Sequence, residues 1–166
     1  MTDWRSSPLD DGHDLSVFAC GVDGLDHWLR EQALRAQRSD TARTYVWSSP
    51  GSPMAVAYYA ITPTQVHRDE LDPVDPDCGR ALPAYLLARL ALDRSMHGQG
   101  LGAQLLLDAV ERITQAAEAT NGRLIVADAM DEDAASFYAH FDFQPILGNL
   151  HRLVMKVATA RLALAC

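Results

Sequence analysis

Lysine is almost absent from this chain. Of its 14 basic residues only Lys156 is a lysine, and this bias alone indicates no function. Acidic residues outnumber basic ones by 22 to 14, so the net charge is −8 and the protein repels polyanions at long range. Composition therefore argues against nucleic-acid binding, unless a local basic surface exists. The candidates for such a surface are four arginines in one stretch: Arg30, Arg35, Arg38 and Arg43.

Cysteines and long hydrophobic runs are also scarce. Cys20, Cys78 and Cys166 show neither metal-ligand spacing nor a disulfide framework, so we expect reduced thiols, a buried structural role for Cys20 and no metal site. No window approaches the roughly 18 apolar residues of a membrane helix, and the acid-rich start has no signal-peptide pattern. We expect a cytoplasmic protein without membrane contact.

Internal repeats, low-complexity tracts and long linkers are missing too. The length of 166 residues and the hydrophobic content of 48% predict one compact domain, 1–166, around one core. Periodicity predicts helices and strands in alternation. The expected helices are 23–38, 100–118 and 132–140; the expected strands are 41–48, 54–62, 84–93, 123–129 and 152–157; the tail, 158–166, stays unassigned.

Two of these segments shape the fold class. Segment 84–93 is nearly all apolar, which is typical of a strand buried on both faces of a sheet. Segment 63–82 contains prolines and an acidic cluster, so we expect an irregular surface loop. Together the elements predict an α/β protein with a mixed, mostly antiparallel sheet flanked by helices, and not a doubly wound fold. The cluster comprises Asp69, Glu70, Asp72, Asp75 and Asp77.

A glycine-rich turn carries the clearest chemical signal. Gly98, Gly100 and Gly102 stand where an expected strand ends and a helix begins, so backbone N–H groups and the positive helix end can approach an anion there. The spacing alone fits an ordinary strand-to-helix turn equally well. A nucleotide P-loop is excluded because Ala103 and Gln104 replace its Lys-Ser/Thr. A dinucleotide fold is disfavoured because antiparallel-looking strands precede the turn.

The segments around this turn resemble a known family. RLALDRSMHGQGLGAQLL, residues 89–106, resembles the acyl-CoA-binding motif of the GNAT acetyltransferase superfamily. ADAMDEDAASFYAHFDF, residues 127–143, is similar to the superfamily's next strand and short helix. Residues 18–47 resemble the opening of acetyltransferase toxins from type II toxin–antitoxin pairs. The likeness covers about residues 5–157 and is weakest across 63–82.

The resemblance implies a site for acetyl-CoA as co-substrate. Tyr138 takes the place of the acid that protonates the CoA sulfur, and a backbone N–H near Leu90–Leu92 would hold the thioester oxygen. Without the resemblance, Tyr138 would read as a core aromatic residue. The implied cofactor contacts are Leu90, Ala91, Leu92, His97, Gly98, Gln99, Gly100, Leu101, Gly102, Ala103, Asp133, Ala134 and Phe137.

This chain departs from the family pattern at several positions. His97 stands where Gln or Arg is usual, and Gln99 where the toxins carry a basic residue. Ala19 replaces an acid before Cys-Gly. Asp142 replaces a glycine between two phenylalanines, and we expect the turn to persist because Asp tolerates positive φ.

The toxin likeness also implies an acceptor. Those enzymes acetylate the amino group of aminoacyl-tRNA and so block translation, and a small DNA-binding antitoxin holds them. The four arginines would then contact tRNA, and a homodimer would pool their charge. An acidic surface instead favours a small amine or a protein amino group as acceptor. A module that binds cofactor or partner without catalysis is the third alternative. No general base is assigned, since an α-amino group has a pKa of about 7.7–8.0.

Overall fold

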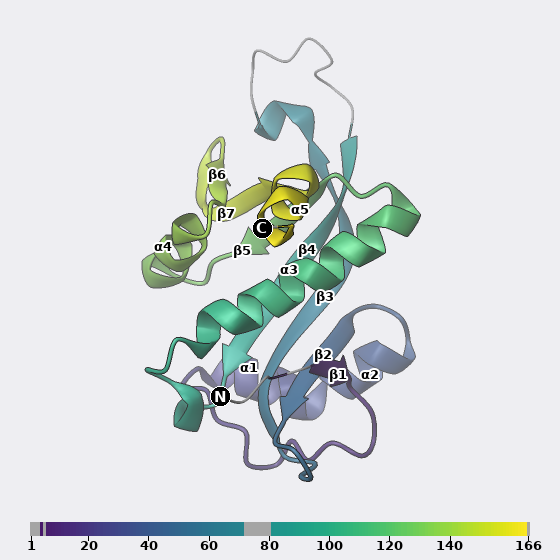
Figure 1. Ribbon diagram of the computed structural model, residues 1–166, viewed down its shortest axis with the longest axis vertical. Coiled ribbons are helices and arrows are strands. Elements are labelled where there is room, and N and C mark those ends of the chain that lie inside the picture. Colours follow the sequence, from purple (N-terminus) through teal and green to yellow (C-terminus); the bar gives the residue numbers. More distant parts are fainter. Residues whose placement is uncertain (1–3, 5, 72–80, 166) are drawn as a thin grey trace. The chain divides into compact units, whose positions relative to one another are not determined.

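A computed structural model describes residue 4 and residues 6–71 and 81–165 (Figure 1). Its described strands form one sheet in the order β1-β2-β3-β4-β5-β7-β6. The strands are β1 (Ser6–Pro8), β2 (Arg43–Ser48), β3 (Ala55–His67), β4 (Ala81–Leu92), β5 (Leu124–Asp128), β6 (Gln144–Ile146) and β7 (Asn149–Lys156). The helices are α1 (Asp23–Glu31), α2 (Ala33–Arg38), α3 (Leu101–Thr120), α4 (Glu132–His140) and α5 (Val157–Leu164), with short 3-10 turns η1 (Arg68–Glu70) and η2 (Arg94–Met96).

The sheet is mixed. β1 pairs with β2, β2 with β3, β5 with β7 and β6 with β7, all antiparallel, whereas β4 and β5 run parallel. This pattern confirms the predicted class, a mixed and mostly antiparallel sheet with flanking helices. The chain divides into two compact units, Met1–Thr62 with Arg89–Ala109 and Pro63–Ala88 with Val110–Cys166.

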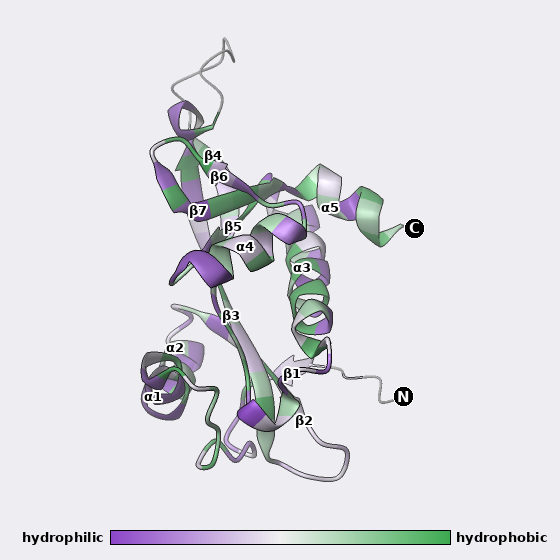
Figure 2. Cartoon of the chain, turned by 90° about the vertical axis from the view of Figure 1, so that its left-hand side faces the viewer, coloured by the Kyte–Doolittle hydropathy of each residue, from purple (hydrophilic) through white to green (hydrophobic). Residues whose placement is uncertain are grey.

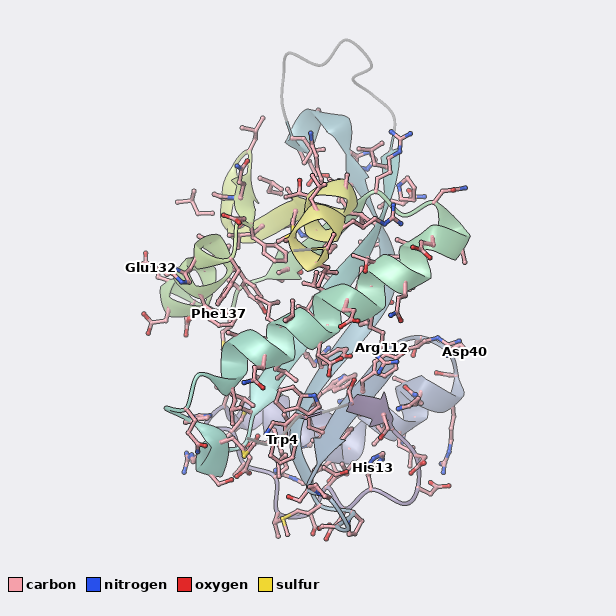
Figure 3. All side chains as sticks on the ribbon, viewed as in Figure 1. Trp4, His13, Asp40, Arg112, Glu132 and Phe137 are labelled. Carbon is pink, nitrogen blue, oxygen red and sulfur yellow. The ribbon has the colours of Figure 1, made fainter. Side chains whose placement is uncertain are left out.

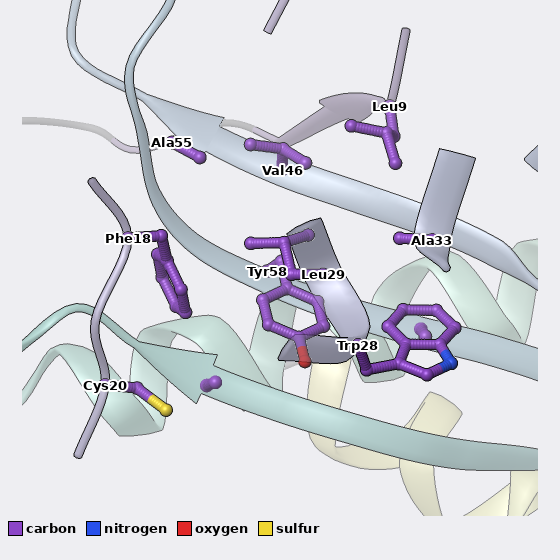
Figure 4. Close-up of a cluster of buried hydrophobic side chains, with 11 residues drawn as sticks. Leu9, Phe18, Cys20, Trp28, Leu29, Ala33, Val46, Ala55 and Tyr58 are labelled. Carbon is purple, nitrogen blue, oxygen red and sulfur yellow. The ribbon is translucent and has the colours of Figure 1, made fainter. Parts of the chain in front are cut away.

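The core of the first unit lies between β2, β3 and the helices α1 and α2. Phe18, Leu29, Val46 and Tyr58 are almost fully buried there, and Figure 4 shows these side chains together. Tyr58 stacks on Trp28 with ring centroids 6.0 Å apart, and its hydroxyl donates a hydrogen bond of 2.8 Å to the Leu25 carbonyl. Aromatic packing therefore fixes α1 on the sheet.

The helix predicted over 23–38 is two helices. Gln32 has φ −126° and ψ −27°, outside the helical region, and separates α1 from α2. Leu29 and Ala33 are both completely buried on either side of this break. The apolar spacing continues through Gln32, so periodicity gave no sign of a change in direction.

The second unit has a smaller core of its own. Val66, Ala84, Leu124 and Val126 are buried together, and α4 packs against β7. The tail that the sequence left unassigned forms α5, which buries Val157 and Ala160. None of the helices within the described ranges has the length and hydrophobicity needed to cross a bilayer.

Several sequence expectations need correction. Segment 63–82 is not wholly irregular, because β3 continues to His67, η1 follows and β4 begins at Ala81; Asp72, Asp75 and Asp77 lie outside the described residues. β4 is not buried on both faces, since only Ala84, Leu87 and Ala91 are buried in it. The short strands β1 and β6 were not predicted, because three residues carry no detectable periodicity.

The remaining elements agree with expectation. α3 has one buried side, with Leu105, Leu106 and Ile113 at 3% exposure or less, and Figure 2 shows both hydrophobic and hydrophilic residues along it. Ala116 has the apolar spacing of that buried side but is exposed. β5 lies within the predicted strand 123–129 and is buried at four of its five residues. α4 has the predicted bounds, and the predicted positive φ at Asp142 is confirmed at 70°.

Candidate active site

The glycine turn of the first unit follows η2 and leads into α3. Gly98 and Gly100 have φ angles of 75° and 73°, a region that residues with a Cβ rarely adopt. A Cβ placed at either glycine would meet no atom within 4 Å, so the space beside this backbone is open. Gly102 lies within the first turn of α3, where N–H groups have no intrahelical partner. The turn therefore has room and N–H donors for an anionic group.

Asp93 anchors this turn to the N-terminal segment. Its carboxylate accepts hydrogen bonds from the Ser95 N–H (3.0 Å), the Ser95 hydroxyl (2.6 Å) and the Ala19 N–H (2.9 Å). The Arg94 N–H donates a hydrogen bond of 2.8 Å to the Ala19 carbonyl. Burial acts to raise the pKa of Asp93, but the bonds from Ser95 and Ala19 outweigh it and lower that pKa. Sequence reasoning missed this residue, although Asp followed two positions later by Ser is a known turn pattern.

The side chains of His97 and Gln99 contact backbone carbonyls of the residues just before them. His97 Nε2 lies 2.9 Å from the Leu92 carbonyl oxygen, and Gln99 Nε2 donates a bond of 3.2 Å to the Ser95 carbonyl. Both side chains are therefore used to hold the shape of the turn. Direct contact between either side chain and acetyl-CoA stays a prediction.

The strand end before the turn contains Leu90, Ala91 and Leu92. Ala91 is buried, whereas Leu90 and Leu92 are half-buried. The parallel pairs of β4 with β5 run from Ala84 to Leu87 and end three residues before Leu90. The N–H that would hold the thioester oxygen belongs to this strand end.

Tyr138 lies in the second unit, on α4. The Asp131 side chain caps the helix by accepting a 2.8 Å bond from the Ala134 N–H, and the predicted contact Asp133 is exposed in the same turn. The Tyr138 ring lies 5.5 Å from both Phe137 and Phe143, measured between ring centroids. Phe137 and Glu132 can be followed on α4 in Figure 3.

The Tyr138 phenol is held in its neutral form. The residue is only 6% exposed, and its hydroxyl makes no hydrogen bond within the part of the chain that the structure describes. Burial, with a smaller effect of the Asp128 carboxylate, raises the pKa of Tyr138 to about 12. An ion pair joins Asp128 to Arg152 at 2.9 Å. The phenol is therefore a proton donor at neutral pH whose hydrogen remains available to a ligand.

Three of the four arginines proposed for tRNA have partners within the protein, and their contact with tRNA stays a prediction. Arg30 donates a 2.8 Å bond to the Phe18 carbonyl, Arg38 pairs with Asp11, and Arg43 lies 3.6 Å from Asp40. Arg35 is exposed and has no partner among the described residues. Three of the four are thus engaged within the protein.

Cys20 is a free, buried thiol, as the sequence predicted. Burial, and then the neighbouring Asp26, raises the pKa of Cys20 to about 11, so the thiol is unreactive at neutral pH. Cys78 and Cys166 lie outside the described residues. In the described ranges we find no group of three or more His, Cys, Asp or Glu side chains that could hold a metal ion.

Comparison with known proteins adds to this geometry. A tRNA-acetylating toxin of Mycobacterium tuberculosis is 36% identical over 137 residues, covering 82% of this chain and 81% of the toxin. The solved structure of AtaT complexed with acetyl-methionyl-tRNAfMet superposes with a TM-score of 0.88 at 27% identity, covering 98% of this chain and 99% of AtaT. A Tyr-to-Phe mutant of AtaT, bound to acetyl-CoA and to the C-terminus of the antitoxin AtaR, gives a TM-score of 0.84 at 26% identity. This match covers 99% of our chain and 100% of the AtaT mutant.

The sequence profile of the acetyltransferase (GNAT) family matches residues 9–143, which include the Asp93 anchor, the glycine turn and Tyr138. This match spans most of the chain. The chain belongs to the acetyltransferase (GNAT) family.

Proposed function

We propose that this protein transfers the acetyl group of acetyl-CoA to the amino group of aminoacyl-tRNA, and so blocks translation as a toxin. The observation that carries the proposal is the 36% identity to a tRNA-acetylating toxin over 82% of the chain. Fold alone would leave the acceptor open, because GNAT-like folds host many substrates. The reaction would place the protein in the cytoplasm, where translation occurs.

The glycine turn is suited to the pyrophosphate of acetyl-CoA. Gly98 and Gly100 leave open space beside their backbone, and the first turn of α3 supplies N–H groups and the positive end of a helix. Gln99 supplies no positive charge there, so binding would rest on backbone donors. A backbone N–H near Leu90–Leu92 would polarise the thioester carbonyl.

The chemistry needs no covalent enzyme intermediate. The amine nitrogen forms a bond to the acetyl carbon, the C–S bond breaks, and the thiolate receives a hydrogen bond or proton from Tyr138. The proton lost by the amine then restores the phenol, directly or through water. Tyr138, with a pKa of about 12, is a weaker acid than a thiol of pKa about 8.5. We infer that its main effect is a hydrogen bond to the charge that develops on sulfur.

The direct test is a transfer assay with defined substrates. Purified protein, acetyl-CoA and aminoacylated total tRNA are incubated briefly, the tRNA is digested, and the aminoacylated 3′ adenosine is analysed by mass spectrometry. The expected product is N-acetylaminoacyl-adenosine. If that product is absent while small amines or protein amino groups are acetylated, the alternative acceptor class replaces this proposal.

We further propose that an antitoxin binds and inhibits this protein. The supporting observation is the AtaT mutant structure, in which a similar chain is bound to the C-terminus of its antitoxin. Co-expression with the product of the adjoining gene, followed by purification through a tag on this chain, tests the proposal. The two proteins should co-purify, and the complex should not acetylate aminoacyl-tRNA.

A further inference from the structure

Arg89 occupies an unusual place in the first unit. Its guanidinium carbon lies 4.2 Å from the centroid of the Trp28 ring, so the flat cation stacks on the indole. Trp28 is itself held against Tyr58, whose hydroxyl bonds to the Leu25 carbonyl. Figure 4 shows Trp28 and Tyr58 side by side in the buried cluster. The platform beneath Arg89 is therefore rigid.

This arginine is half-buried and has no hydrogen bond or acidic partner within the described part of the chain. The chain is not short of acids, since it has 22. The buried carboxylate of Asp26, on the same helix as Trp28, is occupied by the Cys20 N–H at 2.9 Å. Partial burial of an unpaired charge is unfavourable, and the cation–π contact with Trp28 offsets part of that cost. A half-buried guanidinium without an anionic partner can accept one from a ligand.

The free hydrogen-bond donors of Arg89 suit one chemical class. Stacking uses the face of the guanidinium and leaves its N–H groups, which lie in the plane, free at the edge. Those N–H groups match the paired oxygens of a phosphate or carboxylate. Arg35 and Arg94 also lack partners among the described residues, but both are exposed, so water can solvate them.

The position of Arg89 connects it with the reaction. It directly precedes Leu90–Leu92, the strand end that would hold the thioester oxygen, and a strand advances about 3.3 Å per residue. An anion bound by Arg89 would therefore lie near the reacting groups. In aminoacyl-tRNA the last phosphodiester is one nucleoside away from the amino acid.

We propose that Arg89 binds a phosphate of the acceptor next to its aminoacylated end, and so selects aminoacyl-tRNA over amines that lack phosphate. This inference rests on the proposed function. Acetyl-CoA also carries phosphates, and the experiment separates the two sources.

The test compares wild type with Arg89→Gln in steady-state kinetics. Two acceptors are used: aminoacylated tRNA and aminoacyl-adenosine, which carries the same reactive ester and amine but no phosphate. We expect Arg89→Gln to raise the KM for aminoacyl-tRNA at least tenfold. The KM for acetyl-CoA and the rate with aminoacyl-adenosine should stay within twofold. The salt dependence of log kcat/KM for tRNA should become shallower by about one unit.

Two further variants complete the design. Arg161→Gln removes an exposed arginine from α5 and should leave both KM values unchanged, which controls for net charge. Arg89→Lys keeps the charge without the planar fork, and should recover only part of the lost affinity. Thermal unfolding of each variant verifies that it is folded.

The outcomes are distinct. A raised KM for acetyl-CoA would assign the phosphate to the coenzyme and overturn the inference. Equal losses with both acceptors would show a structural role and would also overturn it. An unchanged KM for tRNA in Arg89→Gln overturns the inference alone, whereas a wild type inactive on aminoacyl-tRNA overturns the proposed function as well.

Discussion

At the scale of single residues, the Tyr138 hydroxyl has the clearest functional consequence. Replacing it by Phe keeps the packing against Phe137 and Phe143 but removes the donor for the leaving sulfur. We expect Tyr138→Phe to lower kcat at least tenfold with little change in acetyl-CoA affinity. Single-turnover kinetics and calorimetry measure the two quantities. Tyr85→Phe, which removes another tyrosine hydroxyl, serves as the control, and an unchanged kcat in Tyr138→Phe would remove Tyr138 from the mechanism.

A second residue bears on stability alone. Thr44 is completely buried on β2, and its hydroxyl is the buried side-chain atom without a partner among the described residues. Thr44→Val removes this unsatisfied group while keeping the branched shape, so we expect it to stabilise the fold by about 1 kcal/mol. Urea unfolding measures the change. Thr62→Val should have the opposite sign, because the Thr62 hydroxyl donates to the Thr41 carbonyl at 3.0 Å.

At the scale of elements, one carboxylate fastens α3 to the sheet of the first unit. Asp108 accepts hydrogen bonds from Trp47 Nε1 (2.7 Å), the Tyr59 hydroxyl (2.9 Å) and the Ser6 hydroxyl (2.9 Å), which come from three strands. Trp4 stacks on Trp47 with ring centroids 5.8 Å apart, and Trp4 is labelled in Figure 3.

We expect Asp108→Ala to destabilise the protein by about 2–4 kcal/mol, because buried donors on Trp47 and Tyr59 would lose a charged acceptor. Chemical denaturation followed by tryptophan fluorescence measures this loss. Glu118→Ala removes an exposed acid from the same helix and should change stability by less than about 0.5 kcal/mol. A similar small effect for Asp108→Ala would contradict the role of this network.

The elements also show what the sequence could reveal. α3 and α4 were predicted because long periodicity or flanking signals marked them, and the glycine turn because glycine adopts the positive φ angles that such a turn requires. The hydrogen bonds of Asp108 were not predicted. In the sequence Asp108 has the spacing of the polar face of α3, and only the folded sheet brings Trp47 and Tyr59 to it. Likewise, charge spacing placed Arg38 with other arginines, whereas its partner Asp11 comes from a distant segment.

At the scale of the whole molecule, the Tyr138 phenol makes the stability of the fold depend on pH. Its pKa is raised to about 12, so the folded protein retains this proton more tightly than the unfolded chain, whose tyrosine has a pKa near 10. The stabilisation from this group is therefore fully present below pH 10 and lost as pH rises from about 10 to 12.

Below pH 9.5, where Tyr138 keeps its proton, we expect the acceptor amine to determine how the rate depends on pH. We expect kcat/KM for aminoacyl-tRNA to rise up to about pH 8, as the α-amino group loses its proton, and then to remain level to pH 9.5. Initial rates over short times measure this profile, because aminoacyl esters hydrolyse in base. A fall in rate between pH 8 and 9.5 would mean that a group of lower pKa than Tyr138 supplies the proton.

The Asp93 anchor has a further consequence, for the order of folding. Its bond to the Ala19 N–H joins positions 74 residues apart, so loop closure must precede it. Before that, the glycine turn has only contacts within its own segment, such as the bonds from Ser95 to Asp93 and from Gln99 to Ser95. A chain still emerging from the ribosome would thus gain its anion-binding turn late, after the N-terminal segment has docked. Deleting residues before Ala19 should slow refolding of the turn more than that of α4.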